Sequence, residues 1–389
     1  MNRRVMFYVQ HLLGVGHLKR ASLIARAMAE AGLDVSVVLG GPEVPGVDFT
    51  GCARFPLPPV RAADQTFKVL LDEQGAPIDD VWKDARMARL VAAFEAIRPQ
   101  VLLVEQFPFG RRQFRFELMP LLEQARTSSL RPAILCSLRD VLVRKDDRRR
   151  EQEMVSVAET WFDRILVHGD PRVIPLEASF PAAAALDHKL AYTGYVVDRA
   201  DLDGVANNRQ AGRDEVIVSV GGGAVGEPLL RAALAARPSS RLSGHVWRLI
   251  AGPNLADAVY DQIAWDAPSG VVVERWRADL PVLLRNCVLS VSQGGYNTVM
   301  DVLQARARAV IVPFATGSET EQETRARILE RRGLVTVVAP AVLSAQALAG
   351  AIDAALDTPP ASWAIDLDGA ATTGRIVGAC CGLGAGEGG

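Results

Sequence analysis

The sequence lacks the features that would place the protein in a membrane or on nucleic acid. No window approaches the roughly 20 apolar residues that a membrane-spanning helix needs, and the apolar stretch near the N-terminus is too short for a signal peptide. Neither sign of charge is in excess, because 43 basic residues stand against 45 acidic ones. The formal net charge of -2 gives no overall attraction to nucleic acid or anionic lipid. We therefore expect no nucleic-acid partner, and a cytoplasmic protein that is at most peripheral to the inner face of a membrane.

Cysteines are few, and none has the spacing of a metal site. They are Cys52, Cys136, Cys287, Cys380 and Cys381, an odd and scattered set that suits a reducing cytoplasm. The C-terminal half also lacks a DxD-like acidic pair at a predicted strand end. We therefore expect no metal ion and no cofactor.

Apolar runs of strand length alternate with amphipathic stretches of helix length, which predicts an α/β fold with parallel sheets. In the first half the predicted strands are 5–10, 35–39, 101–105, 132–137, 165–168 and 190–193, and the predicted helices are 18–31, 81–97 and 144–163. Residues 42–80 are rich in Pro, Gly and Asp, which predicts mostly loop. In the second half the predicted strands are 216–220, 246–251, 271–273, 288–291, 309–312 and 335–338, with helices between them.

Two domains follow from this layout and from the chain length. Residues 197–214 have no apolar period and are predicted to link the domains. We expect an N-terminal domain over 1–200 and a C-terminal domain over 201–378, each Rossmann-like. The glycine-rich end, 379–389, is predicted to be disordered.

The first motif runs from His11 to His17, between a predicted strand and a predicted helix. Gly14 and Gly16 allow a tight turn, and a helix N-terminus beside it suits an anion. Arg20 stands where a dinucleotide site would have a glycine, and no acid ends the second strand, which argues against NAD and an oxidoreductase. Histidine at such a turn can act as a general base.

The second motif runs from Ser219 to Gly226, again between a strand and a helix. Gly221, Gly222 and Gly223 cost backbone entropy, which a cradle of N–H groups around a phosphate would explain. The motif lacks the Lys-Ser/Thr of a P-loop, which disfavours nucleotide hydrolysis.

The third motif is the most specific, and it carries a family resemblance. It consists of Trp276, the segment Ser292-Gln293-Gly294-Gly295-Tyr296-Asn297-Thr298, then Asp301, Pro313-Phe314 and Glu321-Gln322. In order and spacing it resembles the donor-binding signature of GT-B glycosyltransferases. It is similar to family 28, which includes the N-acetylglucosaminyltransferase of peptidoglycan synthesis, and to small-molecule glucosyltransferases.

This resemblance implies a GT-B architecture, with two Rossmann-like domains whose parallel sheets face across a cleft. The C-terminal domain would bind a nucleotide-sugar, with UDP as the expected nucleotide. The implied donor-binding residues are Gly14, Gly16, Gly221, Gly222, Gly223, Trp276, Gln293, Gly294, Gly295, Asn297, Thr298, Asp301, Glu321 and Gln322. Trp276 would stack near the base, Asp301 would accept the ribose hydroxyls, and Glu321 would contact the sugar. The family usually has glutamate where Asp301 stands. Trp276 as a core aromatic and Glu321 as part of a solvated charge run remain alternatives.

Strand ends in the first half supply the candidate acceptor site. The predicted acceptor-binding residues are His11, Phe109, Arg111, Arg112 and His168, because aromatics interleaved with arginines suit a phosphate-bearing or lipid-linked acceptor. The alternative is an amphipathic helix that turns its apolar residues into the core. For His168 a purely structural role is the alternative.

The predicted reaction is an inverting, metal-independent transfer of a sugar to an acceptor hydroxyl. His17 is the first candidate for the base, with Glu105 and Asp140 as alternatives; Asp140 could instead cap a helix. A nucleotide-sugar 2-epimerase of the same fold and a non-catalytic nucleotide-sugar-binding protein are the alternative functions.

Overall fold

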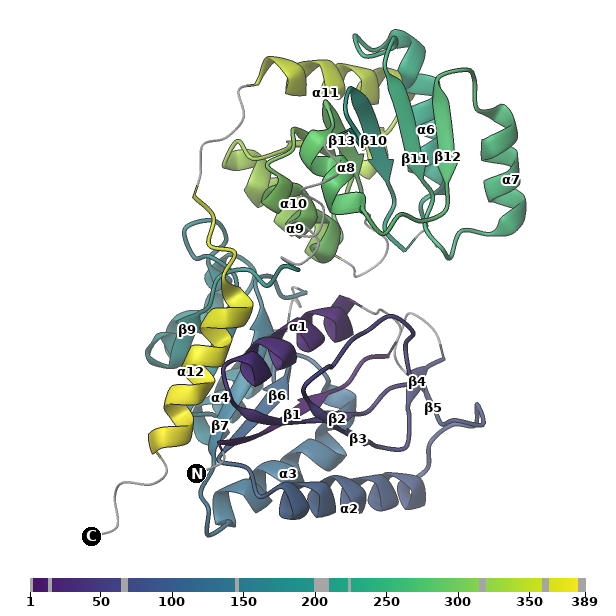
Figure 1. Ribbon diagram of the computed structural model, residues 1–389. Helices are drawn as coiled ribbons and strands as arrows, with labels where there is room; N and C mark the ends of the chain where they lie inside the picture. Colours follow the sequence, from purple (N-terminus) through teal and green to yellow (C-terminus); the bar gives the residue numbers. More distant parts are fainter. Residues whose placement is uncertain are drawn as a thin grey trace. The chain divides into compact units, whose positions relative to one another are not determined.

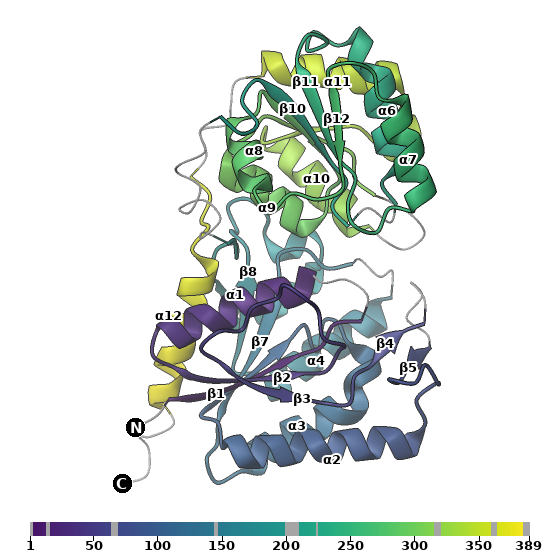
Figure 2. The same cartoon turned by 45° about the vertical axis from the view of Figure 1, so that its right-hand side comes forward.

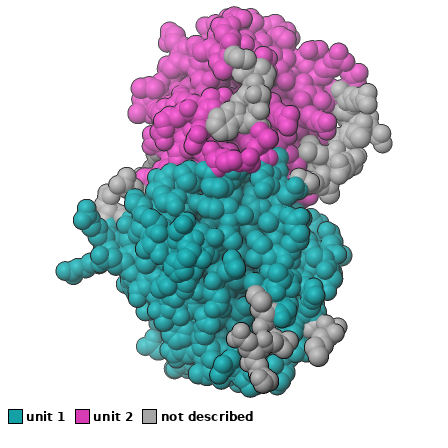
Figure 3. Space-filling view, turned by 90° about the vertical axis from the view of Figure 1, so that its left-hand side faces the viewer, with its two compact units in different colours: residues 1–171, 175–196, 366–389 teal, residues 172–174, 197–365 magenta. Residues whose placement is uncertain are grey.

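The chain forms two compact units, which Figure 3 shows in different colours. The computed structural model describes residues 3–12, 16–63, 69–143, 147–198, 210–222, 225–314, 320–358 and 364–383. Unit 1 comprises residues 1–171, 175–196 and 366–389, and unit 2 comprises residues 172–174 and 197–365.

Unit 1 alternates strands and helices, as its pattern predicts. Its elements are β1 (Arg4–Val9), α1 (Gly16–Glu30), β2 (Asp34–Leu39), β3 (Ala53–Pro56), β4 (Arg61–Ala62), β5 (Leu70–Leu71), α2 (Asp80–Ile97), β6 (Val101–Glu105), η1 (Arg112–Phe114), α3 (Arg115–Thr127), β7 (Ala133–Arg139), α4 (Arg148–Trp161), β8 (Arg164–His168), η2 (Leu176–Ala178), η3 (Pro181–Lys189), β9 (Leu190–Tyr192) and α12 (Gly369–Leu383). The η elements are 3₁₀ helices.

A parallel sheet of order β3-β2-β1-β6-β7-β8-β9 forms the middle layer of unit 1. The chain starts at β1, builds outward to β3, and then returns to the other side of β1 with β6. At such a reversal the loops after the two neighbouring strands diverge to opposite faces and leave a crevice at their carboxyl ends. The segments after β1 and β6 are therefore the expected place for a ligand.

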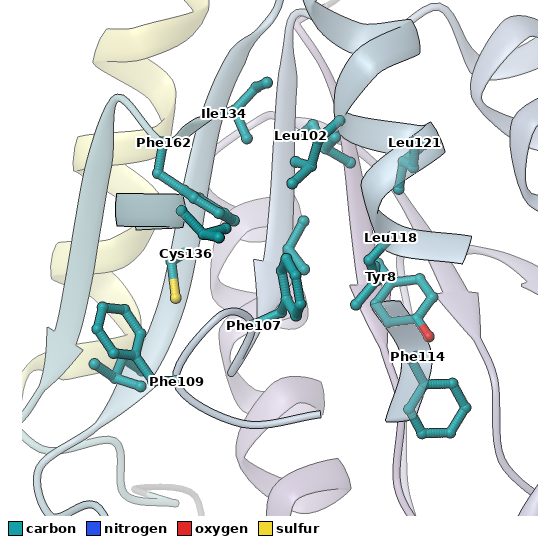
Figure 4. Packing of buried hydrophobic residues seen from close by; sticks show 14 of the residues in the cluster. Tyr8, Leu102, Phe107, Phe109, Phe114, Leu118, Leu121, Ile134, Cys136 and Phe162 are labelled. Carbon is teal, nitrogen blue, oxygen red and sulfur yellow. The ribbon is translucent and has the colours of Figure 1, made fainter. Parts of the chain in front are cut away.

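Alternating side chains of the strands form two cores, one on each face of this sheet. Met6 and Tyr8 of β1 pack with α2, α3 and α4 on one face, and Figure 4 shows Tyr8 with Leu118 and Leu121 of α3 in this core. Val5 and Phe7 pack with α1 and α12 on the other. The unit thus has three layers, and Figures 1 and 2 show α2 and α3 side by side beneath the sheet.

Helix α12 corrects the predicted C-terminal boundary. Residues 366–378 were expected in the second domain, but the chain returns to unit 1, where α12 lies along α1 (Figure 1). Val377, Cys380 and Cys381 are buried in the core beneath α1. The prediction of a disordered end is therefore wrong for 379–383, and residues 384–389 lie outside the described part of the chain.

Unit 2 repeats the layout of unit 1. Its elements are β10 (Glu215–Ser219), α6 (Glu227–Ala236), η4 (Arg237–Ser239), β11 (Val246–Ile250), α7 (Asp257–Asp266), β12 (Val271–Glu274), α8 (Leu280–Asn286), β13 (Leu289–Ser292), α9 (Tyr296–Ala305), β14 (Ala309–Ile311), α10 (Glu321–Arg331), β15 (Thr336–Val337), η5 (Pro340–Val342) and α11 (Ala345–Asp357).

The sheet of unit 2 is parallel, with the order β12-β11-β10-β13-β14-β15. Val216 and Val218 of β10 pack with α6 and α11 on one face, while α8, α9 and α10 cover the other (Figure 2). The reversal falls between β10 and β13, so the two glycine-rich motifs of this half both follow strands at the switch point.

The predicted elements agree with the structure except at their ends and in 42–80. The stretch 42–80 contains three short strands, of which β3 extends the main sheet and β4 pairs antiparallel with β5. Helix α4 begins later than expected, because the Asp147 side chain accepts the N–H groups of Arg149 and Arg150 and caps it. The predicted linker, 197–214, begins where unit 1 ends, and 199–209 lie outside the described residues. Among described residues, no helix combines the length and apolarity that a membrane crossing requires.

Candidate functional site

His17 and Glu105 meet at the switch point of unit 1. His17 lies in the first turn of α1, and Glu105 is the last residue of β6. The His17 Nδ1 atom is 2.8 Å from Glu105 Oε1. The side chain of Glu105 is 1% exposed and that of His17 is 20% exposed. When Nδ1 carries the proton, this N–H donates to the carboxylate and Nε2 keeps the lone pair that can accept a proton.

The charges around this pair favour neutral His17 and ionised Glu105. Burial lowers the pKa of His17 to about 4, with Arg139 and Arg111 adding to the effect and Glu105 opposing it. Burial would raise the pKa of Glu105, but His17, Arg111 and Arg20 outweigh it and hold that pKa well below its usual range. Near neutral pH the imidazole is therefore unprotonated and able to act as a base.

Arg20 explains why this turn departs from a dinucleotide site. Its guanidinium is 3% exposed and donates to Glu105 Oε1 over 2.9 Å. A glycine at this position would let the helix pack closer to the strand, whereas the arginine anchors the carboxylate that orients His17. The sequence showed Arg20 only as a departure from a pattern, and its role depends on a contact with a residue 85 positions away.

The other predicted residues of the first glycine turn are only partly defined. Gly14 is among the residues that the structure leaves undescribed, and Gly16 is the first residue of α1. His11 is 5% exposed. It packs so tightly on Gly41 that a Cβ there would lie 2.4 Å from its Cε1 atom. Burial, followed by Arg111, lowers its pKa, so His11 is neutral.

The aromatic and arginine segment divides between core and surface. Phe109 is 6% exposed and stacks edge-on against Phe180, with their ring centroids 5.6 Å apart. Phe114 and Phe107 are buried in the same core (Figure 4). The prediction of an acceptor-binding role for Phe109 is therefore corrected, because its ring is used in packing, as the amphipathic alternative supposed.

The two arginines of this segment point to different surroundings. Arg111 reaches the pair formed by His17 and Glu105, with its NH2 atom 3.7 Å from Glu105 Oε2. Arg112 is 58% exposed and approaches Glu153 of α4 at 3.9 Å. Both arginines stay candidates for acceptor binding, and Arg111 is the one that lies beside Glu105.

His168 and Asp140 are buried at the neighbouring strand ends. Both are 0% exposed. The two ring nitrogens of His168 are engaged, with Nε2 2.8 Å from Ser137 Oγ and Nδ1 2.9 Å from Thr193 Oγ1. Burial holds the pKa of His168 well below its ordinary value. The acceptor-binding prediction for His168 is corrected to a structural role, and Asp140 has no exposed surface with which to take a proton from a substrate.

In unit 2 the two glycine turns converge. The Gln293 N–H donates to Ser219 O over 3.2 Å, and its side chain donates to Val225 O over 3.3 Å. Gly221 has a φ of 60°, and a Cβ on it would lie 3.7 Å from Thr298 Oγ1. The loops after β10 and β13 therefore form one surface.

Helices α6 and α9 follow these turns, with Gly226 and Gly295 as their N-cap residues, and neither has a side-chain cap. Their first N–H groups therefore lack the partner that a capping side chain would give and suit an anionic group. Gly223 is among the residues without a described position.

Glu321 and Gln322 begin α10, as their pattern predicts. Gln322 Oε1 accepts the Phe314 N–H over 3.0 Å, and a Cβ on Gly294 would lie 3.3 Å from Gln322. Glu321 is 6% exposed and accepts from Arg325 over 2.7 Å. The solvated charge run is thus excluded for Glu321, and Gln322 lies beside the turn after β13.

Trp276 follows β12 and is 66% exposed, so it is not a core aromatic. Asn297 and Asp301 are half-buried on α9, in its first and second turns. Asn254 was not anticipated. Its N–H donates to Gly222 O over 3.0 Å, and its side chain lies beside Gly222. A lone asparagine after a strand gives no pattern that would single it out.

Within the described ranges no group of three His, Cys, Asp or Glu side chains could hold a metal ion.

Comparisons with known proteins agree with this geometry. Residues 217–364 match the model of the glycosyltransferase family 28 C-terminal domain. No curated protein gives a significant sequence match.

Solved structures with the same fold cover nearly the whole chain. A calicheamicin glycosyltransferase is 15% identical, with a TM-score of 0.59, covering 99% of this chain and 96% of its own. MurG of Acinetobacter baumannii is 13% identical, with a TM-score of 0.59, covering 97% and 99%. The UGT2 of Phytolacca americana, solved with UDP-2-fluoro-glucose and pterostilbene, is 12% identical, with a TM-score of 0.61, covering 96% and 94%. The chain therefore has the fold of GT-B glycosyltransferases, and residues 217–364 match the family 28 C-terminal domain of these enzymes.

Proposed function

We propose that the protein transfers a sugar from a UDP-sugar to an acceptor hydroxyl, with inversion and without a metal ion. The observation that carries the proposal is the hydrogen bond between His17 and Glu105 at the switch point of unit 1. A buried carboxylate beside a partly exposed, neutral imidazole is the arrangement of a general base and the group that orients it.

In this proposal His17 Nε2 takes the proton from the acceptor hydroxyl as the oxygen attacks the anomeric carbon. The new carbon–oxygen bond forms on one face while the bond to the β-phosphate oxygen breaks on the other, and its electron pair leaves with UDP. Glu105 holds Nδ1–H and stabilises the imidazolium that forms. Because attack and departure occur on opposite faces, the configuration inverts.

The converging turns of unit 2 support donor binding there. The uncapped starts of α6 and α9 would stabilise negative charge on the leaving diphosphate, which is the task that a metal ion would otherwise perform. Trp276 offers an exposed ring for the base. Asp301 would bind the ribose hydroxyls with a side chain one methylene shorter than glutamate. UDP is the proposed nucleotide because of the resemblance of the motif and because one structural neighbour was solved with a UDP-sugar analogue.

The test is turnover of a panel of UDP-, GDP- and dTDP-sugars with hydroxyl acceptors, followed by NMR assignment of the product anomer. The proposal predicts transfer from a UDP-sugar with inverted configuration and undiminished activity in a chelator. A retained configuration, or activity lost in chelator and restored by magnesium or manganese, would overturn the respective part.

Incubation of the UDP-sugar without acceptor separates the alternatives. An epimerised sugar would support a 2-epimerase, whereas UDP binding without turnover of any acceptor would support a non-catalytic binding protein. The pairing of His17 with a buried carboxylate favours transfer over both. The cytoplasmic location stays a proposal that rests on the cysteine pattern.

A further inference from the structure

Arg111 lies beside the His17–Glu105 pair, and its ion pair with Glu105 is too long to include a hydrogen bond. Its side chain is 14% exposed, and its nearest recorded carboxylate oxygen, Glu105 Oε2, is 3.7 Å away, beyond hydrogen-bond distance. The Nε atom is buried and has no acceptor among the described residues. A guanidinium removed from water without full hydrogen bonding is costly, and a bound anion would remove the cost.

Other guanidinium groups lie near this arginine. Burial lowers the pKa of Arg111, and Arg139 and Arg20 lower it further, while Glu105 and Tyr8 oppose them. Glu105 Oε1 already accepts a hydrogen bond from Arg20 and is within hydrogen-bond distance of His17 Nδ1. Two guanidinium groups, those of Arg20 and Arg111, thus share the Glu105 carboxylate. Such a site attracts an anion, and its low exposure leaves little screening by salt.

The same turn presents a second polar group without a partner. Gln106 is 4% exposed, and its Nε2 atom has no acceptor within the described chain. The Gly110 N–H donates to Gln106 O over 2.8 Å, which closes the turn and brings its two ends together. Gln106 and Arg111 both have positive φ, 68° and 58°. Non-glycine residues in this region are strained, and such strain is concentrated at functional sites.

We propose that the turn 106–111 binds an anionic group of the acceptor, a carboxylate or a phosphate, and so sets its hydroxyl beside His17. Arg111 supplies the charge and two N–H donors in a planar fork, which match either anion. Gln106 supplies a neutral donor. The assignment of the anion to an acceptor rests on the proposed function. Anion binding at this turn does not depend on turnover.

Histidine NMR tests the site without any sugar transfer. The full chain has five histidines, and carbon-13 labelling of their rings gives a signal for His17 that its loss in His17→Asn identifies. Benzoate, inorganic phosphate and the neutral benzyl alcohol are titrated at fixed pH and ionic strength. We expect a saturable shift of the His17 signal with at least one anion and none with the alcohol, and the two anions distinguish carboxylate from phosphate.

Matched variants show whether Arg111 is responsible. Arg111→Gln should weaken anion binding by about tenfold or more, the effect of losing one charged hydrogen-bonding partner, and Arg111→Lys should restore part of it. Arg115→Gln is the control, because Arg115 is 44% exposed and pairs with Glu153. An absent His17 shift with both anions, an equal shift with benzyl alcohol, or unchanged affinity in Arg111→Gln would each overturn the proposal.

Kinetics then separate this proposal from the proposed function. With 4-(hydroxymethyl)benzoate and its methyl ester as acceptors, Arg111→Gln should raise KM for the acid about tenfold and leave KM for the ester and the UDP-sugar unchanged. A raised KM for the UDP-sugar instead would assign Arg111 to the donor and overturn the acceptor proposal. Anion binding without transfer to any acceptor would support the anion site and overturn the proposed function. Transfer to an acceptor without anion binding near His17 would support the proposed function and overturn the anion site.

Discussion

At the scale of single residues, two buried charge clusters in unit 1 have opposite characters. Around Glu105 buried polar atoms, Glu105 Oε2 and Arg111 Nε among them, have no hydrogen-bond partner among the described residues, and His17 remains partly exposed. Around Glu117 the partners are complete. Arg86 donates to Glu117 Oε2 over 2.7 Å and to Gln10 Oε1 over 2.6 Å, and Tyr8 donates to Glu117 Oε1 over 2.5 Å. The first cluster suits chemistry, and the second holds α2 and α3 to the sheet.

His17→Ala should lower turnover about 10²–10⁴-fold, because it removes the proton acceptor. In the wild type, the base stays neutral above its pKa of about 4. The value of kcat/KM should therefore stay constant as pH falls to about 5 and decline only below that. The measurement is a pH profile of initial rates. A limb near the ordinary histidine pKa, or a His17→Ala variant with normal turnover, would remove His17 from the mechanism.

Glu105→Gln is the companion variant for that profile. It keeps the size of the side chain and removes the negative charge that raises the pKa of His17. The acidic limb should therefore move to lower pH as turnover falls. A residue with a merely structural role would leave the limb in place.

Glu117→Gln should destabilise the protein by about 3–5 kcal/mol, because it leaves the fully buried Arg86 without its carboxylate. Arg115→Gln breaks an exposed pair and should change the free energy of unfolding by less than about 1 kcal/mol. Urea unfolding measures both. Equal losses in the two variants would show that burial does not govern the strength of these pairs.

At the scale of elements, the strands were predictable and the exceptions have physical causes. Buried parallel strands are continuous apolar runs, so β6 was located to the residue. Strand β3 is short and largely exposed, and β4 is only two residues long, which leaves them no apolar pattern. Helix α12 contains several glycines, which lower helix propensity, so its sequence gives only a weak helical signal. Its position on α1 depends on small residues that allow close approach.

Two helical glycines provide a matched test of that approach. A Cβ on Gly374 in α12 would lie 3.2 Å from Ala27 O of α1, whereas one on Gly350 in α11 meets nothing within 4 Å. Gly350→Leu should be neutral or stabilising by up to about 1 kcal/mol, since leucine favours helix. Gly374→Leu should destabilise by about 1–3 kcal/mol, because it forces two helices apart. Thermal unfolding measures the stability of both variants. A Gly374→Leu variant that is more stable than the wild type would contradict close packing of α12 on α1.

At the scale of the whole molecule, unit 1 is discontinuous in sequence. It begins at the N-terminus and is completed by residues 366–389, which follow all of unit 2. Truncation after Ile365 should therefore expose the apolar face of α1 and β1 and destabilise unit 1, while α11 of unit 2 keeps its core.

Hydrogen exchange of the truncated chain checks this prediction. Amides of β1 should exchange much faster than in the full chain, and amides of β10 should not. Unchanged protection of β1 would mean that α12 contributes little to the stability of unit 1.

The sequence by itself determined the α/β class, two domains, most strands and the donor motif from Gln293 to Gln322, because these are signalled by local periodicity, glycine and spacing. Tertiary structure alone decided which side chains meet. It paired His17 with Glu105, placed Arg20 and Arg111 beside them, and buried Phe109 and His168. Strand order brings residues together that are far apart along the chain. Successive side chains of a strand point to opposite faces, so a shift of one residue moves a side chain to the other face of the sheet.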